Sequence, residues 1–289
     1  MRSIGEMLAR DGNALQKNLS LTAAEARSEV QILLQHVLAV NRAYLLAHPE
    51  QVPHAGRQTA YAKLLQRRLN GEPVAYILGE REFFGLKFKV TPATLIPRPE
   101  TELLVELAFA HIPPQGRVLD LGTGSGAIAL AIAHARPDAQ VTAVDASAAA
   151  LEVARQNAQG LGIVNVRFMH SDWFAALADE RFDLIVSNPP YVATGDTHLA
   201  RGDLRFEPRT ALASGADGLD DIRRIIPGAN AHLVTDGWLL LEHGYDQAAA
   251  IRSLLLSGGF DRVFSETDLS GIERVSGGRV ADTARSGGI

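Results

Sequence analysis

The chain has 289 residues, of which 46% are hydrophobic and 21% charged, and this composition predicts a soluble globular protein with two domains. The formal net charge of -5, without a dense lysine and arginine run, argues against a nucleic-acid binder, and the absence of cysteine excludes disulfides and thiolate chemistry. Because no stretch approaches the roughly 20 apolar residues of a membrane helix, and no signal peptide is recognisable, we expect a cytoplasmic protein with no membrane partner.

The N-terminal part of the chain predicts a small helical domain. Thr22 and Glu25 have the spacing of a capping box, and apolar residues follow them at helical spacing. A second helical segment, GRQTAYAKLLQRRLNGEP, closes with basic residues before Gly71 and Pro73, a pattern that ends helices. We therefore expect a helical domain at residues 1–73.

A linker with a short β-hairpin is predicted at residues 74–95. Aromatic and β-branched residues flank Gly85 in the segment REFFGLKFKV, a pattern typical of two short strands joined by a turn. The chain then turns helical at Pro99, and Glu100 and Glu102 stand in the first turn, where the helix dipole favours anions. This helix belongs to the larger domain.

The larger domain, predicted at residues 96–281, alternates short apolar segments with helical patterns. Such alternation predicts a doubly wound α/β fold, in which a parallel sheet is covered by helices on both faces. Ligands of open sheets bind beyond the carboxyl ends of the strands, so residues at those ends are expected to share one rim. Residues 282–289 are expected to form a disordered tail. The strand-end residues are Gly122, Asp145, Asp172 and Asn188.

The segment DLGTGSGAIAL, residues 120–130, combines a strand end, a glycine-rich turn and a helix start. Its three alternate glycines let the backbone approach a ligand closely and adopt positive φ angles. Asp145 ends the next strand, where its carboxylate can accept hydrogen bonds from both hydroxyls of a ribose. The two features predict a site for an adenosine-type cofactor, and both NAD and S-adenosylmethionine qualify.

Two features favour S-adenosylmethionine. Asp120 precedes the first glycine in the pattern D-x-G-x-G-x-G, which differs from the G-x-G-x-x-G that leads a helix onto a pyrophosphate. A carboxylate near the turn suits the ammonium and sulfonium of this cofactor. Asp172 and Trp173 can contact the adenine amino group and pack against the base, or serve as a cap and a core residue. The predicted cofactor-binding residues are Gly122, Thr123, Gly124, Ser125, Gly126, Asp145, Asp172, Trp173 and Asn188.

The segment SNPPYV follows the apolar run FDLIV and places two prolines at the end of a buried strand. The Asn188 side-chain oxygen can accept a hydrogen bond from a planar NH₂ group, and the Pro189 carbonyl can accept from its other hydrogen. Because Pro189 and Pro190 have fixed φ and no N–H, the turn presents its carbonyls rigidly. Tyr191 can pack on the flat face of the substrate group. We predict that these four residues are catalytic; a strand terminator is the alternative.

NPPY after a strand, together with D-x-G-x-G-x-G, resembles the class I S-adenosylmethionine-dependent methyltransferases that modify planar nitrogens. Eight segments between about residues 75 and 280 resemble, in the same order, the bacterial release factor glutamine methyltransferases. They are LIPRPETELLVE, DLGTGSGAIAL, HSDWF, FDLIVSNPPYV, RFEPRTAL, DGLDDIRRI, LLLEHG and ERVSGGR.

The resemblance implies the substrate, the cofactor and the fold. The substrate is the glutamine in the Gly-Gly-Gln motif of peptide-chain release factors, which are the partner proteins, and the methyl donor is S-adenosylmethionine. The N-terminal helical domain is expected to recognise the protein substrate. The larger domain is expected to hold a seven-stranded, mostly parallel sheet with an antiparallel strand near its C-terminal end.

Two other functions stay open. A methyltransferase acting on amino groups of RNA or DNA bases should carry a basic groove, and an NAD-dependent oxidoreductase leaves NPPY unused. The nine histidines show no metal-ligand spacing, so no metal is expected, and His243 is interpreted as a loop or strand-end residue. Glu207 is either near the substrate loop or a solvated or capping carboxylate. Arg98 either contacts the substrate backbone or pairs with Glu102.

Overall fold

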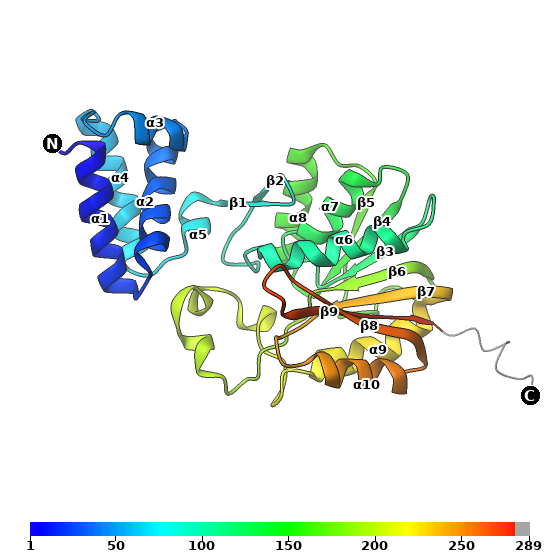
Figure 1. Cartoon of the computed structure of the whole chain (residues 1–289). Helices are drawn as coiled ribbons and strands as arrows, with labels where there is room; N and C mark the ends of the chain where they lie inside the picture. Colours follow the sequence, from blue (N-terminus) through cyan, green and yellow to red (C-terminus); the bar gives the residue numbers. More distant parts are fainter. Residues whose placement is uncertain (281–289) are drawn as a thin grey trace, which may run out of the picture. The chain divides into compact units, whose positions relative to one another are not determined.

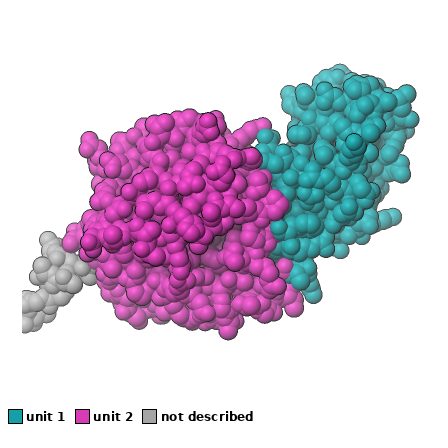
Figure 2. All heavy atoms as spheres, turned by 180° about the vertical axis from the view of Figure 1, so that it is seen from behind, with its two compact units in different colours: residues 1–80, 200–206 teal, residues 81–199, 207–289 magenta. Residues whose placement is uncertain are grey.

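The computed structural model describes residues 1–280, which form two compact units, coloured separately in Figure 2. The helical unit comprises Met1–Glu80 together with Ala200–Phe206, and the α/β unit comprises Arg81–Leu199 and the described residues from Glu207 onward. The domain boundaries placed after residues 73 and 95 stay predictions, and the predicted tail lies outside the described residues. Within the described part of the chain, none of the helices combines the length and apolar character that a membrane span requires.

The helical unit is built from helices whose starts follow from local sequence. The predicted capping box is present before α2: Thr22 accepts the Glu25 N–H at 3.2 Å, and Glu25 accepts the Thr22 N–H at 2.7 Å. A second capping box, Ser3 with Glu6, begins α1, a helix that the sequence analysis did not predict. The helices pack around one apolar core. Their bounds are α1 Ile4–Leu19, α2 Ala23–Leu38, α3 Arg42–Ala47, α4 Ala55–Leu69 and α5 Val74–Leu78.

A segment far along the chain, which includes the short helix η3 Gly202–Phe206, also belongs to the helical unit. Arg68 of α4 is buried and donates to Asp203 at 2.9 Å and to Glu29 of α2 at 2.7 Å. Because a buried guanidinium is costly unless it is paired, these two carboxylates stabilise its position. Asp203 thus holds the segment through an ion pair inside the unit.

The α/β unit contains a seven-stranded sheet with the strand order β5-β4-β3-β6-β7-β9-β8 (Figure 1). The pairs from β5 to β7 are parallel, and β9 is antiparallel to both neighbours, which confirms the expected sheet. The predicted hairpin is also present, as β1 Glu80–Phe83 and β2 Leu86–Lys89. The sheet strands are β3 Arg117–Leu121, β4 Gln140–Asp145, β5 Val166–His170, β6 Phe182–Ser187, β7 Leu233–Glu242, β8 Phe260–Thr267 and β9 Glu273–Val280.

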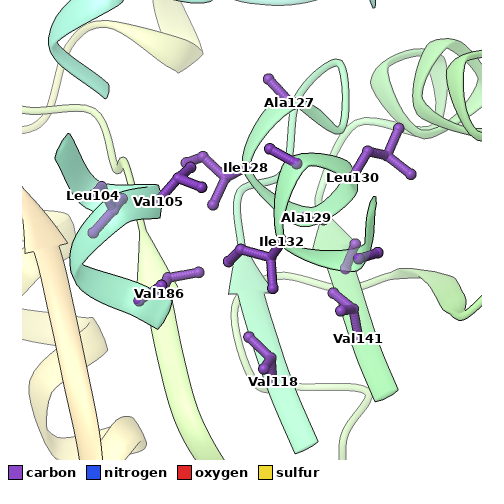
Figure 3. Packing of buried hydrophobic residues seen from close by; sticks show 14 of the residues in the cluster. Leu104, Val105, Val118, Ala127, Ile128, Ala129, Leu130, Ile132, Val141 and Val186 are labelled. Carbon is purple, nitrogen blue, oxygen red and sulfur yellow. The ribbon is translucent and has the colours of Figure 1, made fainter. Parts of the chain in front are cut away.

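Helices cover both faces of this sheet, because its central strands are apolar on both sides. One core cluster packs Val118 and Leu184 against α6 and α7. Figure 3 shows Val118 of this cluster beneath the α7 residue Ile132. The other packs Leu119 and Ile185, the next residues on the same strands, against α9 and α10. This alternation confirms the doubly wound fold. The helices are η1 Pro99–Thr101, α6 Glu102–His111, α7 Ala127–Ala135, α8 Ala148–Leu161, η2 Thr197–Ala200, η4 Arg209–Ala211, α9 Asp220–His232 and α10 Ala248–Ser257.

Candidate active site

The carboxyl ends of four neighbouring strands place the predicted site residues in one row. Leu121 of β3 pairs with Val144 of β4 and with Ser187 of β6, and Ser187 pairs in turn with Leu241 of β7. The Ser187 hydroxyl also donates to the Leu121 carbonyl at 2.8 Å, which ties these two strand ends together. The next residue on each strand therefore stands at the same rim, as expected for an open parallel sheet. These residues are Gly122, Asp145, Asn188 and Glu242.

A cavity of about 550 Å³ opens at this rim, a volume typical of cofactor and small-molecule sites. Most of the predicted site residues line it: Gly122, Thr123, Gly124, Ser125, Asp145, Asp172, Trp173, Asn188 and Pro190. Gly126, Pro189 and Tyr191 do not line it. Thr101, Ile128, Thr210 and Arg224 also line the cavity, and the sequence analysis did not select them.

The glycine turn separates residues that face the cavity from residues that pack the fold. Gly124 has a φ of 57°, and a Cβ added there would meet no atom within 4 Å, so the turn stays open at this point. Gly126 has a φ of 84°, but its added Cβ would lie 3.0 Å from Leu130 and 3.2 Å from Ala154. Gly126 is therefore required where α7 packs against α8, whereas Gly124 leaves room beside the cavity.

Asp145 connects the end of β4 to the glycine turn. Its two carboxylate oxygens accept the Gly124 N–H and the Ser147 N–H, each at 2.8 Å. Burial raises the pKa of Asp145, and these two hydrogen bonds act in the opposite direction. Because each carboxylate oxygen has a second lone pair, Asp145 can hold the turn and still accept hydrogen bonds from a ligand in the cavity.

Asp120 does not line the cavity. Its side chain is fully buried, one oxygen accepts the Thr123 hydroxyl at 2.6 Å, and the other, Oδ1, has no hydrogen-bond partner among the described residues. Burial raises the pKa of Asp120 to about 7. The carboxyl group therefore lies beneath the glycine turn, where it fixes Thr123, rather than beside a ligand.

Asp172 and Trp173 follow β5 and line one wall of the cavity. The Trp173 ring stands 3.5 Å from the position that a Cβ of Gly122 would occupy, and the ring also packs against an apolar core cluster. Asp172 is exposed and accepts a hydrogen bond from Arg224 of α9 at 2.8 Å. Arg224 thus competes with any adenine amino group for this carboxylate. The Trp173 ring has the predicted core contact and also faces the cavity, and its contact with adenine stays a prediction.

The NPPY segment presents two oxygen acceptors. The Asn188 side-chain NH₂ donates to the Thr101 hydroxyl at 3.1 Å, so its oxygen points the other way. Within residues 1–280, neither Asn188 Oδ1 nor the Pro189 carbonyl accepts a hydrogen bond. Tyr191 does not line the cavity; its hydroxyl donates a long hydrogen bond of 3.4 Å to Glu242. The two free acceptors are those that the sequence selected.

Neighbouring loops hold the NPPY segment rigidly from behind. The Tyr191 carbonyl accepts the side-chain NH₂ of Gln247 at 3.0 Å. The next residue, Val192, donates to the Leu212 carbonyl and accepts the Ser214 N–H, both at 2.9 Å. These bonds fix the backbone directly after the two prolines, at Tyr191 and Val192.

The structure also resolves the three residues whose roles the sequence left open. Glu207 is buried and accepts the Ile96 N–H at 3.0 Å, so it is neither solvated nor a helix cap. Arg98 lines the cavity and pairs with Glu207 rather than with Glu102. His243 is a fully buried strand-end residue whose Nε2 lies 2.8 Å from the Ser276 hydroxyl, and it does not line the cavity.

A glycine turn after β3, a carboxylate at the end of the neighbouring strand β4, and NPPY after β6 on the other side of β3 define the class I methyltransferase fold. The chain matches the family models "Methyltransferase small domain" over residues 99–207 and "PrmC N-terminal domain" over residues 15–79. Its fold is similar to the hMettl16 catalytic domain solved with an RNA hairpin, with a TM-score of 0.57, 16% identity, and coverage of 76% of this chain and 82% of that one. For a methyltransferase from Pyrococcus furiosus the TM-score is 0.54 and the sequence identity is 19%. The match covers 79% of this chain and 100% of that one.

Proteins named release factor glutamine methyltransferase are far more similar in sequence. The chain is 52% identical to that of Bordetella pertussis over 91% of this chain and 98% of the relative. The relative from Neisseria gonorrhoeae is 53% identical, over 87% of this chain and 92% of the relative. The relative from Escherichia coli is 48% identical, over 90% of this chain and 94% of the relative. The chain belongs to the release factor glutamine methyltransferases.

Proposed function

We propose that this chain transfers a methyl group from S-adenosylmethionine to the side-chain amide nitrogen of the glutamine in the Gly-Gly-Gln motif of a peptide-chain release factor. Relatives of about half identical sequence, matched over nearly their whole length, bear the corresponding name. The observation that carries the chemistry is the rigid pair of free acceptors, Asn188 Oδ1 and the Pro189 carbonyl, beside the glycine turn.

Asn188 and Pro189 are proposed to hold the glutamine amide by its two N–H groups. S-adenosylmethionine supplies the activated methyl group. An amide nitrogen is a poor nucleophile because its lone pair is delocalised, so the task of the protein is mainly alignment, which can contribute roughly 7–11 kcal/mol. Two fixed acceptors stabilise a nitrogen that becomes tetrahedral more than they stabilise the planar amide, which is the differential binding that catalysis needs.

The other end of the cavity is proposed to hold the cofactor. Gly122 and Gly124 leave space along the turn, Asp145 has lone pairs for the ribose hydroxyls, and the Trp173 ring offers a flat apolar surface for adenine. These residues fit S-adenosylmethionine by shape and by hydrogen-bonding capacity. Asp172 is proposed to accept a hydrogen bond from the adenine amino group in addition to the one from Arg224.

Replacing Asp145 with asparagine is expected to weaken S-adenosylmethionine binding at least about tenfold, because one carboxylate oxygen becomes an NH₂ group that faces a backbone N–H. Isothermal titration calorimetry measures this affinity. The exposed Asp179→Asn is the matched control and should bind as the parent does. Equal affinities of the two variants would remove Asp145 from the cofactor site.

The substrate class is tested by incubating the protein with labelled S-adenosylmethionine and either a release factor or total RNA. Mass spectrometry should locate the methyl group on the glutamine of the Gly-Gly-Gln motif. A release factor with that glutamine replaced by alanine is the control and should take up no label. Label found only in RNA would instead support the base methyltransferase that the sequence left open.

The helical unit is proposed to recognise the release factor, since a single glutamine side chain offers too little surface for selectivity. The cytoplasm, where release factors act on ribosomes, is the proposed site of action. The mild net charge of -5 gives no support to a nucleic-acid substrate.

A further inference from the structure

Glu242 is a buried carboxylate that the proposed alignment of the glutamine does not use. It ends β7 in the row that contains Asn188, and its exposed fraction is 1%. One of its oxygens, Oε2, has no hydrogen-bond partner among the described residues. Because such a group destabilises a fold unless it has a compensating role, its place beside the site requires an explanation.

Glu242 is linked to both ends of the NPPY segment, directly to Tyr191 and through Thr101 to Asn188. The Tyr191 hydroxyl donates to Glu242 Oε1 at 3.4 Å. The Thr101 side chain stands close enough to the Glu242 carboxyl group to lower the pKa of that group as a donor, and the same Thr101 hydroxyl accepts the Asn188 NH₂ at 3.1 Å. Thr101 is 4% exposed and lines the cavity. A short chain of polar contacts therefore runs from Glu242 through Thr101 to Asn188.

This chain of polar contacts has a direction. A threonine hydroxyl has one proton, and an ionised carboxylate can only accept, so the proton of Thr101 points to Glu242. The side of the hydroxyl that faces Asn188 then carries lone pairs only, and Asn188 must present its NH₂ group there. Its oxygen is consequently left for the substrate.

We propose that Glu242 is a positioning residue for methyl transfer: through Thr101 it fixes which way round the Asn188 carboxamide lies, so that an oxygen faces the glutamine amide. This inference rests on the proposed function. Glu242 does not touch the substrate, and Tyr191 is held by the same carboxylate. Without it, the carboxamide can turn over and present an NH₂ group, which cannot accept from the substrate nitrogen.

The charge state of Glu242 supports this role. Burial raises the pKa of Glu242 to about 7, and Glu100 of η1 acts in the same direction. Arg274 of β9 and the hydrogen bonds from Thr101 and Tyr191 act in the opposite direction. A protonated Glu242 can donate to Thr101 and release the Thr101 proton toward Asn188, which permits the inverted carboxamide. Methyl transfer should therefore fall as the pH is lowered through about 7.

The test uses Glu242→Gln, Thr101→Val and Thr101→Ser in the full chain, with a release factor and S-adenosylmethionine as substrates. Glu242→Gln and Thr101→Val should lower kcat about tenfold or more, leave cofactor affinity unchanged, and abolish the fall in rate near pH 7. Thr101→Ser keeps the hydroxyl and should retain kcat within about threefold of the parent. Glu266→Gln, an exposed residue of β8, is the matched control.

Stability separates a positioning role from a structural one. A folded-state pKa raised from 4.5 to about 7 means that the folded chain loses stability as the pH rises across that interval. Glu242→Gln removes this loss, so its unfolding midpoint at pH 8 should equal or exceed that of the parent while kcat falls. If the parent is active and both Glu242→Gln and Thr101→Val keep its kcat and its pH profile, the positioning role alone is overturned. A parent that does not methylate the release factor overturns the proposed function as well.

Discussion

Replacing Asn188 with alanine is expected to lower kcat for methyl transfer to the release factor at least about 100-fold, because the substrate amide loses its directed side-chain acceptor. The affinity for S-adenosylmethionine should stay within about threefold, since the glycine turn and Asp145 keep their mutual hydrogen bonds. Single-turnover rates at saturating cofactor measure the first quantity, and calorimetry measures the second.

Two further results test this interpretation of Asn188. The unfolding transition of the variant should match that of the parent, since the asparagine side chain makes one hydrogen bond, to Thr101. Equal losses in kcat and in cofactor affinity would contradict the assignment, because they would mean that the whole cavity had been disturbed rather than the acceptor removed.

The sheet and the rim were predictable because they depend on local patterns. Strands buried on both faces are continuous apolar runs, and in parallel strands the residue after each run necessarily meets its neighbours at one edge. Asn188 and Asp145 could therefore be placed near the glycine turn without knowledge of the strand order. The start of α1 has an equally local signal, because Ser3 and Glu6 have the spacing of a capping box.

The residues that support the site were not predictable, because their partners lie far apart in the sequence. Thr101 and Asn188 are separated by 87 positions, and Tyr191 and Glu242 by 51. Arg98 illustrates the same limit: Glu102 was the partner considered from the sequence, whereas the fold brings Glu207 to it. Whether two such polar side chains meet depends on which of them the fold buries. A sequence indicates burial only for apolar residues, through their periodicity.

Substitution of Gly218, a residue outside the cavity, is expected to have a second large effect, on stability and on kcat. Its φ is 79°, and a Cβ added there would lie 2.1 Å from the Tyr191 carbonyl oxygen and 2.7 Å from the Gln247 side-chain nitrogen. Gly218→Ala must therefore displace the hydrogen bond that holds the NPPY backbone. We expect the free energy of unfolding to fall by about 1 kcal/mol for the left-handed backbone and by a further 1–3 kcal/mol, roughly, for the clash.

Gly271 provides the matched control for the Gly218 substitution. Its φ of 77° is nearly the same, but an added Cβ would meet nothing within 4 Å, so Gly271→Ala should cost only the backbone term of about 1 kcal/mol. Urea denaturation of both variants measures the difference, and kcat should fall in Gly218→Ala alone, because only that substitution moves the Tyr191 carbonyl. If the two variants lost equal stability and equal activity, the rigid hold on NPPY would have no part in methyl transfer, and the alignment of the glutamine amide would have to depend on the cavity wall instead.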